Sequence, residues 1–288
     1  MTDQIMACID GSQLSNAVCD YATWAAREMA APITLVHMLS KKGTSRADTD
    51  YSGTLGLGGR EALMEELTSL DEKRSRLALE HGKMLLEEYR ERARAYGATD
   101  VHTRQRHGRL VGALSEIEDD IGLLVLGKQG RASEQDNDKE HLGSNLERVV
   151  RTLHKPVLIA VGTEFVEPRR LMMAFDNSDV ARRGIETLAS SKLVSRLECH
   201  VVMISDDQHD AEQALKWAGD VLKAADVSVV TAVREGEVAR TLESYADENA
   251  IDMIAMGAYG HSRIHYLFSG STTTKMMQTT HLPLLLLR

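Results

Sequence analysis

The sequence contains an internal duplication, and this repeat constrains the fold more than any other feature. The first half opens with an apolar run, Ile5 to Ile9, that ends in Asp10-Gly11-Ser12. After Arg169 the same order of signals starts again, with Leu171 to Phe175 ending in Asp176-Asn177-Ser178. Two stretches with the same signals in the same order predict two copies of one structural unit.

The two halves also end alike. Gly143 stands 13 residues before Pro156, and Gly270 stands 13 residues before Pro283. A short apolar run with a strand pattern follows each proline directly. The repeat therefore covers whole domains, which we expect at residues 1–162 and residues 169–288.

Each half alternates strand and helix patterns four times and closes with a fifth strand. That alternation is typical of α/β folds, in which a mostly parallel sheet is joined by right-handed crossovers. Ligands in such open sheets bind beyond the carboxyl ends of the strands, where the strand order switches direction. The loops expected at that place follow the first and fourth strands of each half.

Composition excludes several classes of protein. The 288 residues carry a net charge of −9, which argues against a broad nucleic-acid-binding surface. No run of 18 apolar residues is present, so we expect no membrane span. The first residues lack the pattern of a signal peptide, and the three cysteines have no metal-like spacing. These features favour a cytoplasmic, soluble protein with buried, unreactive thiols.

The loop after the fourth strand of the second half has the pattern of a phosphate site. Gly257 ends an apolar run, Gly260 follows, and Gly270-Ser271 begins a helical stretch. Glycines at the end of a strand let an anion approach backbone N–H groups, and a helix N-terminus adds free N–H groups and a positive dipole end. The sequence therefore predicts phosphate binding here.

These residues resemble the universal stress protein family in its tandem, two-domain form. The family's ATP motif is glycine, two residues, glycine, nine residues, glycine, then Ser or Thr, and Gly257, Gly260, Gly270 and Ser271 fit it without a gap. The resemblance implies two Rossmann-like domains of the adenine-nucleotide alpha-hydrolase type, each with a five-stranded parallel sheet flanked by helices. It also implies that the final strands, Val157–Val161 and Leu284–Leu287, pair between the domains.

The resemblance further implies that ATP is the ligand and that an aspartate after the first strand of each half contacts its adenine and ribose end. Asp10 and Asp176 occupy that position. Asp176 could equally serve as a turn or cap residue, as Asp often does after a strand. The chain would then be a stress-response module that binds an adenine nucleotide and unidentified protein partners.

The first half departs from the motif. Gly127 and Gly130 are in place, but twelve residues separate Gly130 from Gly143, and Ser144 supplies the hydroxyl. These twelve residues, within which the insertion lies, carry four carboxylates, which raise the electrostatic cost of a polyphosphate unless a metal such as Mg²⁺ bridges them or they point away. They are Glu134, Asp136, Asp138 and Glu140. We expect the second half to bind nucleotide more readily.

Three polar residues of the second loop are candidates for phosphate contacts. Arg263 and the hydroxyls of Ser271 and Thr272 can make charge-assisted hydrogen bonds to phosphate oxygens. The alternative is a solvated loop in which Ser271 is an ordinary helix N-cap.

Several catalytic motifs are absent from the sequence. It has no G-x-x-x-x-G-K-[ST] phosphate loop, no G-x-G-x-x-G after a strand and no G-x-S-x-G elbow. A binding module without robust catalysis is therefore the first hypothesis. Two alternatives stay open, a slow ATPase or nucleotidyl-transfer enzyme, and a carrier or scaffold that binds a non-nucleotide ligand.

One segment of the first half has no counterpart in the second. Residues 41–59 are polar and glycine-rich, typical of an exposed loop, and Arg60 to Tyr96 has the pattern of a long helix. The helix could cover the sheet or the domain junction, or act as a partner-binding surface or lid. Because a tandem chain can pair its final strands internally, both a monomer and a homodimer are consistent with the sequence.

Overall fold

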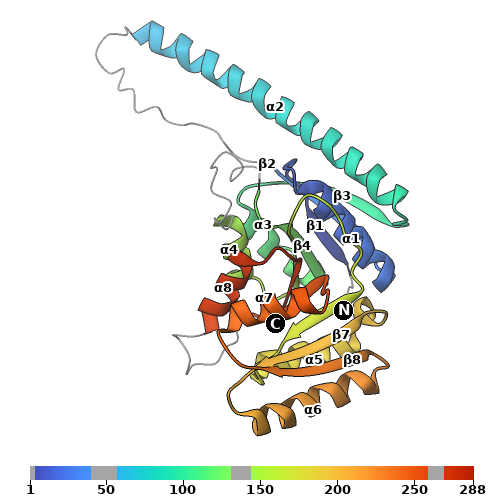
Figure 1. The fold of residues 1–288 in the computed structure, drawn as a ribbon. Helices are drawn as coiled ribbons and strands as arrows, with labels where there is room; N and C mark the ends of the chain where they lie inside the picture. Colours follow the sequence, from blue (N-terminus) through green and yellow to red (C-terminus); the bar gives the residue numbers. More distant parts are fainter. Residues whose placement is uncertain (1–3, 40–56, 131–143, 259–268) are drawn as a thin grey trace.

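The computed structural model describes residues 4–39, 57–130, 144–258 and 269–288 (Figure 1). Each half follows the predicted alternation of strands and helices. The elements of the first half are β1 (Ile5–Cys8), α1 (Ser15–Met29), β2 (Ile33–Leu39), α2 (Leu57–Ala95), β3 (Val101–His107), α3 (Leu110–Ser115), η1 (Glu118–Asp120), β4 (Leu123–Gly127), α4 (Ser144–Thr152) and β5 (Val157–Ala160). Those of the second half are β6 (Arg170–Ala174), α5 (Asp179–Ser190), η2 (Lys192–Val194), β7 (Glu198–Ile204), α6 (Gln208–Ala224), β8 (Ser228–Arg234), α7 (Val238–Glu248), β9 (Met253–Gly257), α8 (Ser269–Thr279) and β10 (Leu284–Leu287).

The strands form one continuous ten-stranded sheet in the order β3-β2-β1-β4-β5-β10-β9-β6-β7-β8. Within each half the five strands are parallel, which confirms the predicted fold class. The halves meet where β5 pairs with β10 antiparallel, with Leu158 opposite Leu285. The pairing of final strands that the family resemblance implied is therefore confirmed.

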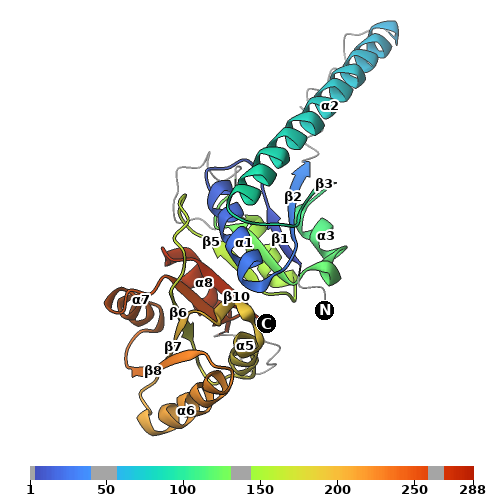
Figure 2. The same ribbon diagram turned by 90° about the vertical axis from the view of Figure 1, so that its right-hand side faces the viewer.

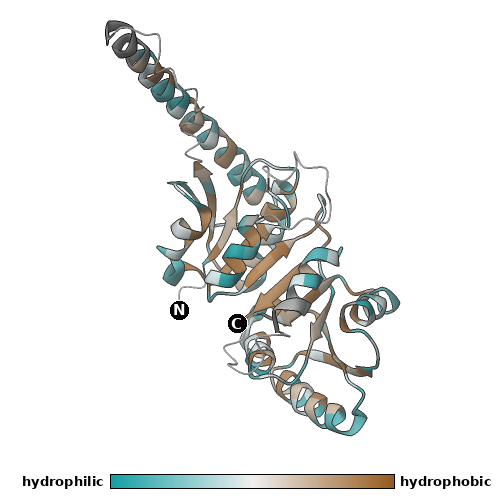
Figure 3. Ribbon diagram, turned by 90° about the vertical axis from the view of Figure 1, so that its left-hand side faces the viewer, coloured by the Kyte–Doolittle hydropathy of each residue, from teal (hydrophilic) through white to brown (hydrophobic). Residues whose placement is uncertain are grey.

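Both faces of the sheet are covered by helices, because its strands are apolar on both sides. β10 illustrates the alternation: Leu285 and Leu287 join the core under α1, α2, α5 and α6, whereas Leu284 and Leu286 join the core under α3, α4, α7 and α8. In Figure 3 the strands form an apolar layer, and polar residues lie on the outer faces of the helices.

Contacts outside the sheet also join the halves. Phe165, in the segment between them, packs edge-on against Tyr21 of α1, with ring centroids 4.8 Å apart. Leu193 and Val194 of η2 are buried in the same core as α1. The two repeats are therefore packed against one another as well as hydrogen-bonded through β5 and β10.

The long helix α2 begins at Leu57, three residues before the predicted start, so residues 57–59 belong to it and not to the loop. Its 39 residues compare with 17 in α6, its counterpart. Only its C-terminal part packs on the sheet, through buried Leu86, Tyr89 and Ala93. The preceding turns project away from the domain in Figure 1 and in Figure 2, so α2 does not cover the junction of the halves.

None of the helices in the described ranges is both long and apolar enough to span a lipid bilayer.

Candidate functional site

The first and fourth strands of each half are neighbours, so the loops that follow them meet at one edge of the sheet. β6 pairs with β9 with Ala174 opposite Met256, which brings the turn at Asp176 beside Gly257. In the first half β1 pairs with β4, and Asp10 and Gly127 follow the paired segments. After β1 and β6 the chain continues to β2 and β7, which lie nearer the edges of the sheet, whereas after β4 and β9 it continues to β5 and β10 at the centre. This reversal is the switch point at which open parallel sheets bind ligands.

The turn after β6 holds Asp176 in a defined position. Its Oδ1 accepts hydrogen bonds from the backbone N–H of Ser178 at 3.0 Å and from the Ser178 hydroxyl at 2.6 Å. Ser178 Oγ in turn accepts from the N–H of Ala181 at 3.3 Å and caps α5. Asn177 between them has a φ of 61°, in the left-handed region. Asp176 therefore does stabilise the turn after β6, which was one of the two roles expected for it, and the residue is exposed.

The turn after β1 has the same aspartate-to-backbone hydrogen bond, and here Ser15 adds two further contacts. Asp10 Oδ1 accepts from Ser12 N–H at 3.0 Å and from the hydroxyl of Ser15 at 3.2 Å. Gly11, with a φ of 74°, donates its N–H to Ser15 Oγ at 3.0 Å. The sequence did not single out Ser15. Its place at the first turn of a helix after an Asp-x-Ser turn is the signal that could have found it.

Asp10 and Gly130, which the sequence placed in one site, lie together. A Cβ atom on Gly130 would stand only 2.8 Å from Asp10 Oδ2, so any larger residue would displace the carboxylate or the loop. Glycine at position 130 therefore leaves room for the Asp10 carboxylate where it lies in this turn.

Gly127 and Gly257 have a packing role that sequence reasoning missed. A Cβ on Gly127 would lie 3.1 Å from Leu14 Cβ, and one on Gly257 would lie 3.0 Å from Val180 Cγ1 and 3.3 Å from Ala181 N. Both glycines let the start of the first helix of each half, α1 or α5, approach the end of the fourth strand closely. They shape the site whether or not an anion touches their backbone.

The helix predicted from Ser271 begins two residues earlier, at Ser269, and therefore includes Gly270 and Ser271. Thr272 is half-buried in its first turns. Because α8 crosses back from β9 to the parallel strand β10, its N-terminus faces the carboxyl edge of the sheet. In the first half α4 begins at Ser144, as predicted. Gly143, Gly260 and Arg263 lie outside the described residues.

Lys128, next to Gly127, points out of the first-half site. Its ammonium is buried and donates hydrogen bonds to the carbonyl oxygens of Gln278 at 2.6 Å and Thr280 at 3.0 Å, at the C-terminal end of α8. Burial lowers the pKa of Lys128. The equivalent residue of the second half is Ala258, whose carbonyl accepts a hydrogen bond from Arg288 at 3.2 Å. The two glycine loops therefore differ in chemistry as well as in length.

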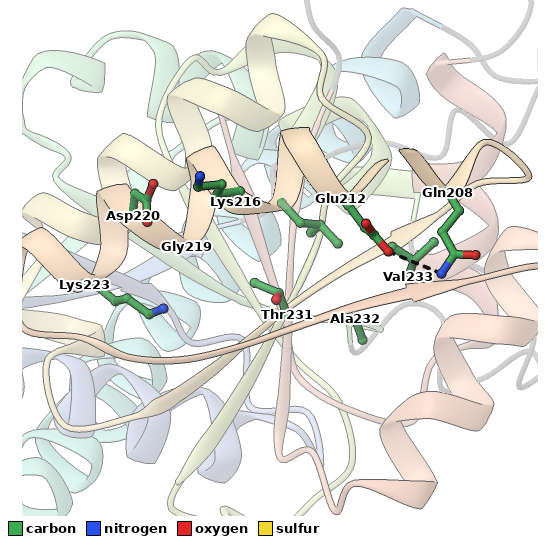
Figure 4. A pocket seen from close by; sticks show the side chains of 10 residues that line it. Gln208, Glu212, Lys216, Gly219, Asp220, Lys223, Thr231, Ala232 and Val233 are labelled. Atoms are coloured by element: carbon green, nitrogen blue, oxygen red, sulfur yellow. Dashed lines mark hydrogen bonds between the residues drawn. The ribbon is translucent and has the colours of Figure 1, made fainter. Parts of the chain in front are cut away.

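A surface hollow of about 430 Å³ lies elsewhere, between α6 and the edge strand β8 (Figure 4). It is lined by Gln208, Glu212, Leu215, Lys216, Gly219, Asp220, Lys223, Thr231, Ala232 and Val233. None of the predicted site residues is among them, and the mixture of charges matches no single ligand. Across the described residues, no three His, Cys, Asp or Glu side chains gather to hold a metal ion.

Comparison with known proteins agrees with the repeat and with the fold. A model of the universal stress protein family matches residues 1–160 and again residues 168–288. A universal stress protein from Synechocystis sp. is 29% identical over 287 residues, covering 99% of both chains. The crystal structure of a universal stress protein from Archaeoglobus fulgidus superposes with a TM-score of 0.74 at 18% identity, covering 99% of this chain and 98% of the other.

A protein of unknown function from Pseudomonas aeruginosa has the same fold, with a TM-score of 0.60 at 15% identity over 99% of this chain and 92% of its own. These structural likenesses support the fold alone. The family match covers both halves of the sequence. The chain therefore belongs to the universal stress protein family, with two copies of the family's domain in tandem.

Proposed function

We propose that this chain is a regulatory, nucleotide-binding protein of stress response that holds ATP, or a related adenine nucleotide, chiefly in its second half. The observation that carries the proposal is the meeting of Asp176 and Gly257 at the ends of neighbouring strands, at a switch in strand order. The loop after Gly257 also carries the family's glycine spacing, with Gly257, Gly260, Gly270 and Ser271 in place. At the end of this loop, α8 supplies a helix N-terminus.

The two halves differ in ways that favour the second. Asp176 is exposed, and so is available to the hydroxyls of a ribose or the edge of a base, whereas Asp10 is half-buried beside Gly130. Lys128, between the two glycines of the first pair in sequence, donates hydrogen bonds to the carbonyls at the end of α8. The first loop is also longer than the motif and carries four carboxylates between Gly130 and Gly143, which oppose a polyphosphate.

The proposal assigns the phosphate contacts to Arg263, Ser271 and Thr272 and to the N–H groups at the start of α8. Charge-assisted hydrogen bonds from such groups are the stronger kind. Mg²⁺ bound with the nucleotide would reduce the repulsion among its phosphate oxygens. In the first half, Asp10, Gly127, Gly130, Gly143 and Ser144 form the weaker counterpart of this site.

Catalysis is not part of the proposal. Within the described residues, one hydroxyl–histidine–carboxylate chain exists: His200 lies 2.9 Å from the Tyr245 hydroxyl through Nδ1 and 2.9 Å from Glu198 through Nε2. Glu198 begins β7, so this chain lies at the amino edge of the sheet, opposite the candidate site. A metal-dependent steady release of phosphate or pyrophosphate that is lost on Asp176→Ala would favour the enzyme alternative instead.

The experiment that tests the proposal is mass spectrometry of small molecules that remain with the natively purified full chain. We expect an adenine nucleotide in the wild type and little of it in Asp176→Ala, while Asp10→Ala retains it. An occupant of another chemical class would contradict the proposal and support the carrier alternative. Nucleotide lost only from Asp10→Ala would assign the site to the first half.

A further inference from the structure

Helix α2 exposes a row of apolar side chains, the leucine stripe, made of Leu67, Leu70, Leu77 and Met84. Their exposed fractions are 48%, 54%, 65% and 73%. All four precede Leu86, Tyr89 and Ala93, the buried residues through which α2 packs on the sheet, and the N-terminal turns of the helix project from the domain in Figure 2. Exposed apolar side chains aligned along one side of an otherwise charged helix, rather than scattered singly, are the pattern of a contact with another molecule.

The leucine stripe is not a continuation of the face that packs on the sheet. That packing face consists of Gly82, Leu86, Tyr89 and Ala93, all buried. Met84 follows Gly82 by two residues, and two residues turn an α-helix by about 200°. The stripe therefore runs along the opposite side of α2, facing away from the described residues of the sheet on which α2 packs.

The spacing of the stripe identifies the kind of contact. Leu70, Leu77 and Met84 are separated by seven residues each, and Leu67 stands three before Leu70. A seven-residue apolar repeat forms the seam of a left-handed coiled coil, with these residues at the d positions. The matching a positions are Leu67, Arg74 and His81.

We propose that α2 of this protein pairs with α2 of a second copy as an antiparallel two-stranded coiled coil and so makes the protein a dimer. A parallel pair would set Arg74 against Arg74 of the second copy in the seam. It would also place Glu66 beside Asp71 of the second copy at the flanking positions. Like charges in these places oppose association.

The antiparallel pair removes both conflicts. In the register that packs Leu67 against Met84 of the second copy, Arg74 meets Leu77 and its aliphatic stem covers the seam. Lys73 then faces Glu80 of the second copy, and symmetry makes this pair twice. Glu66 meets Glu87 only at the two exposed ends, and Glu87 is already ion-paired with Arg90. Charge complementarity therefore selects the second copy and its direction.

The rest of the fold agrees with a contact through the helix. The final strand of each half, which would otherwise present an edge, is paired with the other within the chain, Leu284 lying opposite Ile159. The final strands are therefore not available to pair with a second copy. Helix α2 is the element that reaches farthest from the sheet in Figures 1 and 2.

The first test is the oligomeric state of the full chain by analytical ultracentrifugation. We expect a concentration-dependent dimer, and a rise in its dissociation constant of more than about tenfold in Leu70→Glu/Leu77→Glu. Thermal unfolding of this variant at low protein concentration should match the wild type, because both side chains are exposed in the single chain. Glu72→Lys, on the outer side of the helix, is the control and should leave the dimer intact. A monomeric wild type, or a dimer that survives the double substitution, would overturn the proposal.

The second test examines direction. Lys73→Glu and Glu80→Lys should each weaken the homodimer, since each places like charges together twice. Mixed in equal amounts, the two variants should form a heterodimer, because every Lys73–Glu80 contact is then complementary again. In a parallel pair Lys73 would face Ala78, so neither variant would be affected and mixing would change nothing. That result would reject the antiparallel arrangement.

Discussion

The ammonium of Lys128 donates a hydrogen bond of 2.6 Å to the carbonyl oxygen of Gln278, 150 residues further along the chain. A second bond, to Thr280 O, is 3.0 Å long. The end of a helix exposes unpaired carbonyl groups and a partial negative charge, which a cation stabilises. Lys128 thus links the first glycine loop to the helix whose other end forms part of the second-half candidate site.

Replacing Lys128 by Met should lower the free energy of unfolding by about 1–3 kcal/mol, because the carbonyl groups of Gln278 and Thr280, the second of them buried, lose a charged donor. Urea unfolding followed by circular dichroism measures this change. Lys192→Met, at an exposed position, is the control and should change it little. An unchanged unfolding midpoint in Lys128→Met would show that the contact does not hold the halves together.

The base of α2 is anchored by an ion pair between Arg92 and Asp20. Arg92 Nε and Nη2 each lie 2.7 Å from one Asp20 oxygen, and the Asp20 side chain is 7% exposed. Asp20→Asn should cost about 2–3 kcal/mol of stability, less than for a fully buried pair because Arg92 is partly exposed. Arg94→Met breaks only an exposed pair with Glu91 and should cost less than about 1 kcal/mol. Equal losses in chemical denaturation would contradict this account of the anchor.

Two helical glycines should respond differently to alanine. A Cβ on Gly219 of α6 would lie 3.5 Å from Thr231 Cγ2, an ordinary contact, so Gly219→Ala should stabilise by about 0.5–1 kcal/mol. A Cβ on Gly184 of α5 would lie 3.0 Å from Met173 Cε and 3.3 Å from Leu287 Cδ1, so Gly184→Ala should gain less or destabilise. Thermal unfolding compares the two. A higher midpoint for Gly184→Ala than for Gly219→Ala would refute the packing described for α5.

Glu198 should make stability depend on pH in the acid range. The hydrogen bond from His200, assisted by Arg170, lowers the pKa of Glu198 below its ordinary 4.5. A carboxyl group with a lower pKa in the folded state stabilises the protein above its unfolded pKa, and that contribution is lost as the pH falls through the folded value. The stability difference between wild type and Glu198→Gln should therefore shrink below pH 4.5. A constant difference from pH 7 to pH 3 would contradict this.

Much of the fold could be predicted from the sequence, because the buried strands and the paired Asp-x-Ser turns leave clear local patterns. Ile5–Cys8 and Arg170–Ala174 lie where the apolar runs placed them. The pairing of β5 with β10 came from the family resemblance, since a sequence of leucines does not specify its partner strand. The start of α2 at Leu57 was missed because Gly58 and Gly59 disfavour helix by local propensity.

The site was predictable only in part. Asp10, Asp176 and the glycines after β4 and β9 could be assigned to one edge because topology brings those loops together. The contact from Lys128 to Gln278 could not, because it joins residues far apart in sequence and depends on how the halves pack. The direction of α2 was also hidden, since the same helical pattern suits a helix on a sheet and a helix that leaves it.

Nucleotide binding in the second half is the central claim, and calorimetric titration of the full chain with ATP and Mg²⁺ tests it most directly. Because Asp10 and Asp176 occupy equivalent turns, Asp10→Ala and Asp176→Ala form a matched pair. We predict one strong site per chain that persists in Asp10→Ala and is weakened at least about tenfold in Asp176→Ala. Undiminished binding in Asp176→Ala, or no heat of binding in the wild type, would contradict the account.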